Sequence, residues 1–160
     1  MNFDISIVQA FISGFDDFLI QLGVALGLFA FAVFVYVILT PHKEIRLIQE
    51  GNASAALAFG GIVLGLAIPM GSCLAHSLGL IDLAIWGAVS LLLQLIAFRF
   101  VDLILHGLPR RIAEGDVAAA LVVVSVKVGI GLIMAGALSD PSLGLFRSAA
   151  AAAAAAAGPL

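Results

Sequence analysis

Three charged residues lie inside stretches of sequence that are otherwise almost entirely apolar. Arg99 and Asp102 are three positions apart in one stretch, and Lys127 lies in the middle of the next. A charge placed at the centre of a lipid bilayer costs at least ~2.5 kcal/mol, so such residues are usually paired or functional. If both stretches are membrane helices, these three side chains are expected to meet in one intramembrane polar cluster that could line a path for ions or polar solutes.

A simpler arrangement of the same residues has no shared cluster. Arg99 and Asp102 are one helical turn apart and can pair within their own helix. Lys127 can then extend its long side chain along its helix to the polar boundary of the membrane. In both arrangements two cations face one anion. The remaining positive charge needs a carboxylate of another subunit, a lipid headgroup, a passing anion or water.

Two similar polar motifs each precede an alanine-rich stretch: Glu50-Gly51-Asn52 and Glu114-Gly115-Asp116. Asn and Asp are preferred helix N-caps, and the preceding glycine allows the sharp turn that leads into a cap. The motifs therefore predict two capped helix starts. The alternative is a paired cytoplasmic site, in which two helix N-termini with Glu50 and Glu114 nearby bind a cation or a basic segment of a partner.

No other pattern in the sequence predicts catalysis or a cofactor. Cys73 and His76 are three positions apart, but two ligands do not make a zinc site, and a single cysteine excludes an intrachain disulfide. The segment GSCLAHS has no nucleophile elbow, and phosphate-loop, dinucleotide and HExxH motifs are absent from the sequence. We therefore expect a protein that is not an enzyme and that holds no metal or cofactor.

The composition is that of a protein embedded in a lipid bilayer. Of the 160 residues, 63% are hydrophobic and 11% are charged, whereas about a quarter of a soluble domain is charged. The net charge of −3 and the scattered basic residues exclude nucleic acid as a partner. A membrane-spanning helix needs about 20 apolar residues, and four segments meet that need: 18–40, 54–77, 83–105 and 117–138. The fold class predicted is an all-α integral membrane protein with four transmembrane helices.

The chain matches itself when it is shifted by 64 residues. The matches need no gap and include Gly23 with Gly87, His42 with His106, Arg46 with Arg110, Glu50-Gly51 with Glu114-Gly115, and Ala55-Ala56-Leu57 with Ala119-Ala120-Leu121. The sequence therefore predicts two helical-hairpin repeats, 17–78 and 79–140. Because each repeat contains two spans, the repeats are parallel rather than inverted. The positions equivalent to Arg99, Asp102 and Lys127 hold Val35, Ile38 and Val63, so the charges belong to the second repeat alone.

The two ends of the chain are set apart from these repeats. In segment 1–16, apolar residues recur every four positions at Phe3, Ile7, Phe11 and Phe15. This spacing predicts a short amphipathic helix at the membrane interface, and an irregular tail is the alternative. Segment 141–160 is a low-complexity alanine-rich tail. It has the composition of a linker or of unassigned placeholder residues, and no function is assigned to it.

Basic residues in the connecting segments predict the orientation in the membrane. Lys43 and Arg46 lie in loop 41–53, and Arg110 and Arg111 lie in loop 106–116. By the positive-inside rule both loops are cytoplasmic, so both termini are expected to be periplasmic.

Glycines at short spacings predict where helices approach one another. Small residues allow close contact of membrane helices, either within one chain or between copies. The helix-packing candidates are Gly23, Gly27, Gly61, Gly65, Gly129 and Gly131. Pro69 is expected to kink the second span or to end its regular part.

The motif EGNASAALAFGG, within residues 41–68, resembles the domain of unknown function 350 family of YjfL-like small bacterial inner-membrane proteins. Residues 107–138 resemble the same pattern more loosely, and the resemblance covers residues 15–140. It implies four spans built as two hairpins in a bacterial inner membrane. It implies no activity, and no catalytic residue is carried over from it.

Two functions fit these observations. The first is a non-enzymatic, multi-pass inner-membrane protein that forms a homo-oligomer and lines or gates a path for ions or small polar solutes. The second is an accessory or scaffold subunit that docks onto a larger membrane protein complex. The lipid bilayer surrounds the protein in both.

Overall fold

The fold is described from a computed structural model, which covers residues 3–40, 44–140, 148–149 and 152. The named helices of this part of the chain are α1 (Phe3–Leu39), α2 (Glu44–Gln49), α3 (Ala53–His76), α4 (Leu80–Ile104), α5 (Leu108–Ala113) and α6 (Val117–Leu138). Four stretches are long and apolar enough to cross a membrane: Gly14–Leu39 of α1 and the whole of α3, α4 and α6. The predicted all-α fold with four spanning helices is confirmed.

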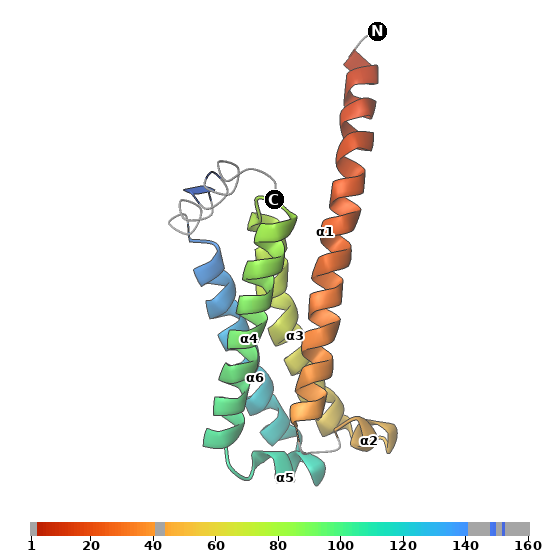
Figure 1. Cartoon of the computed structure of the whole chain (residues 1–160). Helices are drawn as coiled ribbons and strands as arrows, with labels where there is room; N and C mark the ends of the chain where they lie inside the picture. The colour runs from red at the N-terminus through yellow and green to blue at the C-terminus, as the bar shows by residue number, and fades with distance from the viewer. Residues whose placement is uncertain (1–2, 41–43, 141–147, 150–151, 153–160) are drawn as a thin grey trace.

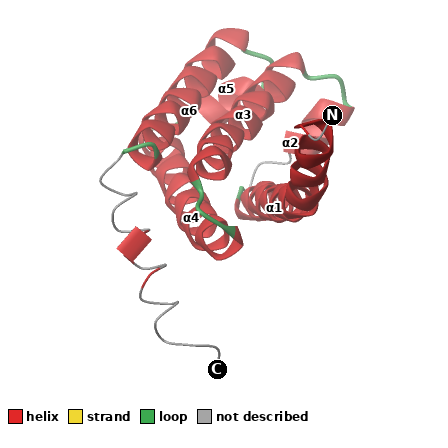
Figure 2. Cartoon of the chain, turned by 90° about the horizontal axis from the view of Figure 1, so that it is seen from above, coloured by secondary structure: helices red, strands yellow, loops and turns green. Residues whose placement is uncertain are grey.

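The four long helices run side by side, and the two short helices lie together at one end of the bundle (Figure 1). Helix α3 contacts each of the other three spans, and its most extensive contact is with α6. Seen along the bundle, α1 lies at the side away from α6 (Figure 2). The predicted connection 106–116 contains α5, and connection 41–53 contains α2.

Two local expectations differ from the structure. Helix α1 continues without a break from Phe3 to Leu39, so the N-terminal segment is neither a separate short helix nor an irregular tail. The side chains of residues 3–13 lie outside the described ones, so the interfacial placement of segment 1–16 stays a prediction. Pro69 does not end its helix, because α3 extends to His76 and holds Pro69 in its interior.

Three of the six predicted packing glycines lie at the contact of α3 with α6. A Cβ atom on Gly61 would lie 2.6 Å from Val124 Cγ2, and one on Gly131 would lie 2.6 Å from the carbonyl oxygen of Gly65. Only glycine allows the two backbones to come this close. A Cβ on Gly23, Gly27 or Gly129 would meet nothing within 4 Å, so these three do not mediate close packing within the described chain.

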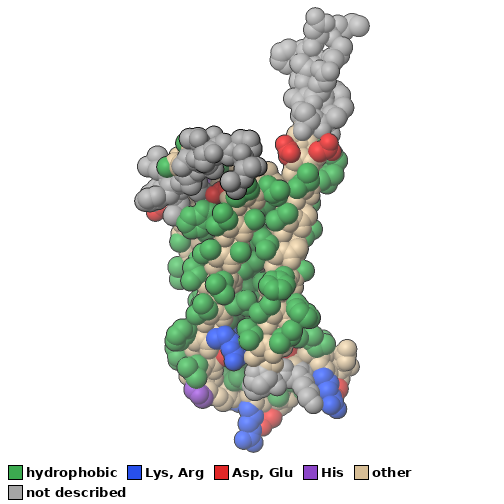
Figure 3. All heavy atoms as spheres, in the orientation of Figure 1, with side chains coloured by type: hydrophobic (Ala, Val, Ile, Leu, Met, Phe, Trp, Pro, Cys, Tyr) green, Lys and Arg blue, Asp and Glu red, His purple; other side chains and the backbone are tan. Residues whose placement is uncertain are grey.

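The face of the bundle seen in Figure 3 is apolar along most of its length, and the Lys and Arg side chains on this face lie toward the end formed by α2 and α5. Large apolar side chains such as Phe31, Phe34, Phe100 and Ile133 are at least 60% exposed. In a membrane these side chains contact lipid tails rather than water, as expected for helices of this hydropathy.

Candidate functional site

Lys127, halfway along α6, is buried inside the bundle with 1% of its surface exposed. Its Nζ lies 2.8 Å from Asp102 Oδ1 of α4 and donates a hydrogen bond of 2.9 Å to Tyr36 Oη of α1. A buried charge is tolerated when it is both paired and hydrogen-bonded. Two other spanning helices, α1 and α4, therefore supply the groups that accommodate this ammonium.

Two aromatic rings complete the surroundings of the Lys127 ammonium. Its Nζ lies 4.9 Å from the centre of the Tyr36 ring and 5.3 Å from that of Phe98. The two rings pack edge to face, with centres 6.3 Å apart. Cation–π attraction acts at these distances and is stronger where water is excluded.

The structure brings two of the three predicted cluster residues into contact and leaves the third nearby. Asp102 pairs with Lys127, whereas Arg99 makes no ion pair with any described residue. The Arg99 side chain is exposed and lines the same cavity as the ion pair. The arrangement differs from the simpler alternative, because Asp102 is bonded to Lys127 and not to Arg99.

A cavity of about 470 Å³ leads from the α2–α5 end of the bundle to this ion pair. Its polar lining residues are Thr40, Glu44, Arg99, Asp102, His106 and Lys127. Its apolar walls come from α2, α3, α4, α5 and α6 and include Leu47, Ile62 and Ile112. The cavity is large enough for a small solute and its solvating water.

Glu44, the first residue of α2, brings a second carboxylate to the cavity. Burial raises its pKa to about 7; the positive charge of Lys127 opposes this shift, and the negative charge of Asp102 adds to it. Near neutral pH the side chain is therefore divided between its neutral and its charged form. A carboxyl group in this state can accept or release a proton when the charge in the cavity changes.

Sequence reasoning missed Tyr36 and Glu44 as members of the site. Tyr36 is the only tyrosine of the chain, and a lone hydroxyl near the end of an apolar span was a signal that could have been used. Glu44 carried no such signal, because its position in a polar connection is also that of an ordinary solvated carboxylate. Only the fold of α2 over the bundle end brings it to the cavity.

The two glycine-containing motifs form the same turn at both helix starts. Gly51 and Gly115 have positive φ angles of 86° and 93°. Glycine adopts this backbone conformation without strain because it has no Cβ. The hydrogen bonds also match: Glu50 N–H donates to Arg46 O and Asn52 N–H to Leu47 O, and the same bonds recur 64 residues later. These turns end α2 and α5 and begin α3 and α6.

The caps that follow these turns differ in a way that explains why one is Asn and the other Asp. Asn52 accepts from Ala55 N–H through its oxygen and donates through its amide to the carbonyl oxygens of Ile112 and Ala113, at 3.2 and 3.0 Å. It therefore ties α3 to the end of α5. An aspartate at this position has no proton to donate to those carbonyls.

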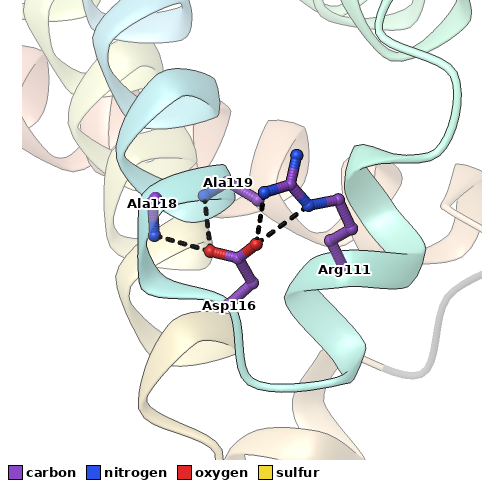
Figure 4. A network of polar contacts seen from close by, with 4 residues as sticks. All are labelled: Arg111, Asp116, Ala118 and Ala119. Carbon is purple, nitrogen blue, oxygen red and sulfur yellow. Dashed lines mark hydrogen bonds and ion pairs between the residues drawn. The ribbon is translucent and has the colours of Figure 1, made fainter.

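Asp116 is held by donors from its own half of the chain (Figure 4). It accepts from the N–H groups of Ala118 and Ala119 and pairs with Arg111 at 2.6 Å. The hydrogen bond from Ala119 and the contact with Arg111 lower the pKa of Asp116. Both predicted capping roles are therefore present in the structure, and the Asp116 carboxylate serves as a cap and not as an open ligand.

Glu50 and Glu114 do not converge on a common site. Each pairs with an arginine four residues earlier in the short helix that precedes it, Arg46 at 2.8 Å and Arg110 at 2.9 Å. All four side chains are largely exposed. The paired cation site considered from the sequence has no geometric support in these contacts.

Cys73 and His76 occupy different surroundings in α3. Cys73 is buried beside Leu83, whereas His76 is exposed, with Nδ1 2.8 Å from the carbonyl oxygen of Ser72. Within the described part of the chain, no group of three or more His, Cys, Asp and Glu side chains is placed to hold a metal ion.

Residues 7–138 match the family described as Domain of Unknown Function (DUF350). The chain belongs to this family. It is also 32% identical over 107 residues to the UPF0719 inner membrane protein YjfL of Escherichia coli strain K12, and equally to that of Escherichia coli O157:H7. These matches cover 67% of this chain and 81% of each relative. No solved structure matches the chain.

The predicted family is thus confirmed, and the membership supports a multi-pass protein of the inner membrane. The four apolar helices are consistent with this location. The family description names no reaction, so the site has to be interpreted from its own geometry.

Proposed function

We propose that this chain is a non-enzymatic inner-membrane protein that assembles with copies of itself and lines or gates a path for ions or small polar solutes. The supporting observation is the Lys127–Asp102 ion pair, which lies at the inner end of a cavity lined by ionisable side chains. Charged groups inside membrane segments usually mark a solute or proton path.

Bundle stability alone gives no reason for these charges. A buried ion pair is often no more stabilising than apolar residues of similar volume. The first hairpin has Val35, Ile38 and Val63 where the second has Arg99, Asp102 and Lys127. Apolar residues thus fill the equivalent places in the same fold, which supports a functional role for the charged ones.

The two hairpins are proposed to be a tandem duplication, in parallel orientation. The repeated turns support it, because their hydrogen bonds correspond at a spacing of 64 residues along with the residues themselves. The α2–α5 end is proposed to face the cytoplasm, since Arg46, Arg110 and Arg111 lie there. The cavity would then open toward the cytoplasm, and both termini would be periplasmic.

An oligomer is proposed because the charged cavity occupies only one end of a single chain. Beyond Lys127 the buried polar side chains of α4 are Ser90 and Gln94, and the rest of the described core in that direction is apolar. A path between copies would use the outer surface of α4, where Arg99 is exposed. Gly23 and Gly27 leave a strip on α1 without side chains, and a Cβ at either position would meet no described residue within 4 Å.

Flux through reconstituted vesicles tests this function. Purified protein is inserted into liposomes, and the release of potassium, chloride and small solutes is compared with that of Lys127→Met. The proposal requires a flux that the substitution reduces at least tenfold. The control, Arg110→Met, removes an exposed cation outside the cavity and should leave the flux unchanged. Vesicles as tight as protein-free ones would refute the proposal.

The accessory-subunit alternative has support from one observation, the unpartnered glycine strip of α1. Native mass measurement after gentle extraction distinguishes the two. Multiples of the 16.4 kDa chain alone indicate self-assembly. Stoichiometric co-migration with larger foreign subunits indicates an accessory role, and the strip would then be the docking surface.

A further inference from the structure

The cavity contains four charged side chains, of which only two are ion-paired with one another. Lys127 and Asp102 are in contact at 2.8 Å. Arg99 and Glu44 line the same cavity, yet neither makes an ion pair with any described residue. Arg99 is exposed and Glu44 is partly buried. The guanidinium of Arg99 is therefore open to a ligand.

The charge of the cavity depends on whether Glu44 carries a proton. With Glu44 ionised, the charges of Arg99 and Lys127 are balanced by those of Asp102 and Glu44. With Glu44 neutral, one positive charge remains unbalanced, and the group that carries it without a partner is Arg99. The cavity therefore attracts an anion only when Glu44 is protonated.

We propose that the cavity binds an oxyanion at Arg99 together with a proton at Glu44. A guanidinium matches the two oxygens of a carboxylate or a phosphate group with paired N–H donors, which makes this ligand class the natural one. The inference rests on the proposed function and names its ligand class. The oxyanion can come from a free solute or from a lipid headgroup, because the two present the same group.

The surroundings of Glu44 support the proton side of this coupling. The ionisable groups near it lie on three spanning helices and in the segment after α4. They are Tyr36 of α1, Arg99 and Asp102 of α4, His106 after α4, and Lys127 of α6. Burial is the main cause that moves the Glu44 pKa to about 7. A bound anion adds a negative charge, so it raises this pKa further, and by linkage protonation strengthens anion binding.

Binding of sodium acetate to the purified full chain, in an uncharged detergent, tests the coupling by calorimetry at pH 6 and pH 8. Acetate keeps its charge across this range. If only the protonated cavity binds, the affinity should fall about tenfold between these pH values, in proportion to the competent fraction set by a pKa near 7.

Three variants assign the effect to its residues. Arg99→Gln should abolish acetate binding at both pH values, and since Arg99 is exposed the variant should keep its fold and elution volume. Glu44→Gln should bind at pH 8 as tightly as the unaltered protein binds at pH 6. His106 also lines the cavity, and His106→Gln should retain the tenfold change. Loss of the change in this variant alone would overturn the assignment to Glu44.

The pair Arg46–Glu50 supplies the matched controls. It joins α2 to the turn that follows it, is exposed, and does not line the cavity. Arg46→Gln and Glu50→Gln should bind acetate as the unaltered protein does. Acetate binding that survives Arg99→Gln overturns the proposal, and so does an absence of both acetate binding and lipid retention.

Native mass spectrometry with phosphatidylglycerol identifies the source of the oxyanion. Retention of this lipid that requires Arg99 and that competes with acetate identifies a headgroup, whereas acetate binding without competition identifies a free solute. Either result supports the site. Coupled binding without vesicle flux would refute the path while preserving this inference. Flux that depends on Lys127 without any Arg99-dependent ligand would refute the inference alone.

Discussion

The two side chains of the buried ion pair are exposed to different extents. Lys127 is 1% exposed and Asp102 is 21% exposed. Asp102 lies close to the polar end of α4 and borders the cavity, so it can be solvated when its partner is lost. Lys127 has no such access and depends on Asp102, Tyr36 and the aromatic rings.

This inequality predicts an asymmetric mutational effect. Asp102→Leu should be the more damaging change, by about 3–5 kcal/mol, because it leaves a buried cation without its counter-charge. Lys127→Met should be milder, and the double variant should recover most of the loss. Thermal unfolding in detergent measures all three, and additive effects in the double variant would argue against direct coupling of the pair.

Glu44 predicts how stability depends on pH. Its pKa in the folded protein is about 7, above the ordinary value of 4.5, so folding favours the protonated form. The folded chain then binds more protons than the unfolded chain between these values, and its stability falls as pH rises from about 5 to 8. In Glu44→Gln this fall should be smaller. Unfolding temperatures at pH 5 and pH 8 test it, and equal slopes in both proteins would contradict it.

The two caps should lose different amounts of stability when Asn and Asp are exchanged. Asn52→Asp keeps the cap on Ala55 N–H but places a carboxylate against the carbonyl oxygens of Ile112 and Ala113. A loss of about 1–3 kcal/mol is expected from that repulsion and the missing donors. Asp116→Asn keeps a cap acceptor and loses only an ion pair with the exposed Arg111, which is worth about 0–1 kcal/mol. Unfolding measurements should show a clearly larger loss of stability for Asn52→Asp. The reverse order would refute a stabilising role of the Asn52 hydrogen bonds to Ile112 and Ala113.

At the scale of the helices, the sequence predicted which spanning helices exist and their order better than it predicted which helices pack against one another. Long apolar runs between polar motifs are enough to predict α3, α4 and α6 within a few residues, because lipid requires each span to satisfy its own backbone. The small-residue spacings could not be assigned in the same way. Gly61 and Gly23 both have a glycine four positions later, yet only Gly61 lies against another helix.

The contact of α3 with α6 makes a prediction about these glycines. Gly131→Ala would place a methyl group 2.6 Å from the backbone oxygen of Gly65. Backbone cannot move aside as a flexible side chain can, so a loss of about 1–3 kcal/mol is expected. Gly129→Ala, two residues earlier, meets nothing within 4 Å and should be neutral or stabilising by up to about 1 kcal/mol. Comparable destabilisation by both variants would show that close approach at Gly131 is not the cause.

At the scale of the whole molecule, pattern alone could predict the site only in part. Arg99, Asp102 and Lys127 are conspicuous in apolar surroundings, and their types led to the right region. Which of the two cations pairs with Asp102 could not be predicted from the sequence. Lys127 is also hydrogen-bonded to Tyr36 near the end of α1, and Glu44 of α2 lines the same cavity. These contacts join residues up to 91 positions apart, and no local periodicity encodes them.

The arrangement of the ends predicts a labelling pattern. The proposed orientation places α2 in the cytoplasm and the start of the α1 span in the periplasm. In a Cys73→Ser background, a cysteine at the exposed position Gln49 should react with an impermeant maleimide only after the inner membrane is opened. A cysteine at exposed Asp16 should react in intact spheroplasts. The opposite pattern would invert the proposed topology.

The position of Lys127 in α6, the fourth span of the described residues, has a consequence for biogenesis. A ribosome delivers α1 and α4 to the membrane before α6, so Tyr36 and Asp102 are already there when Lys127 arrives. A lysine at the middle of a span disfavours partitioning into lipid by about 2.5–3.5 kcal/mol, and these earlier groups offset that penalty as the helix leaves the translocon. Insertion of α6 is thus assisted by helices that precede it, and Asp102→Leu should lower the fraction of chains that insert α6 in addition to destabilising those that do.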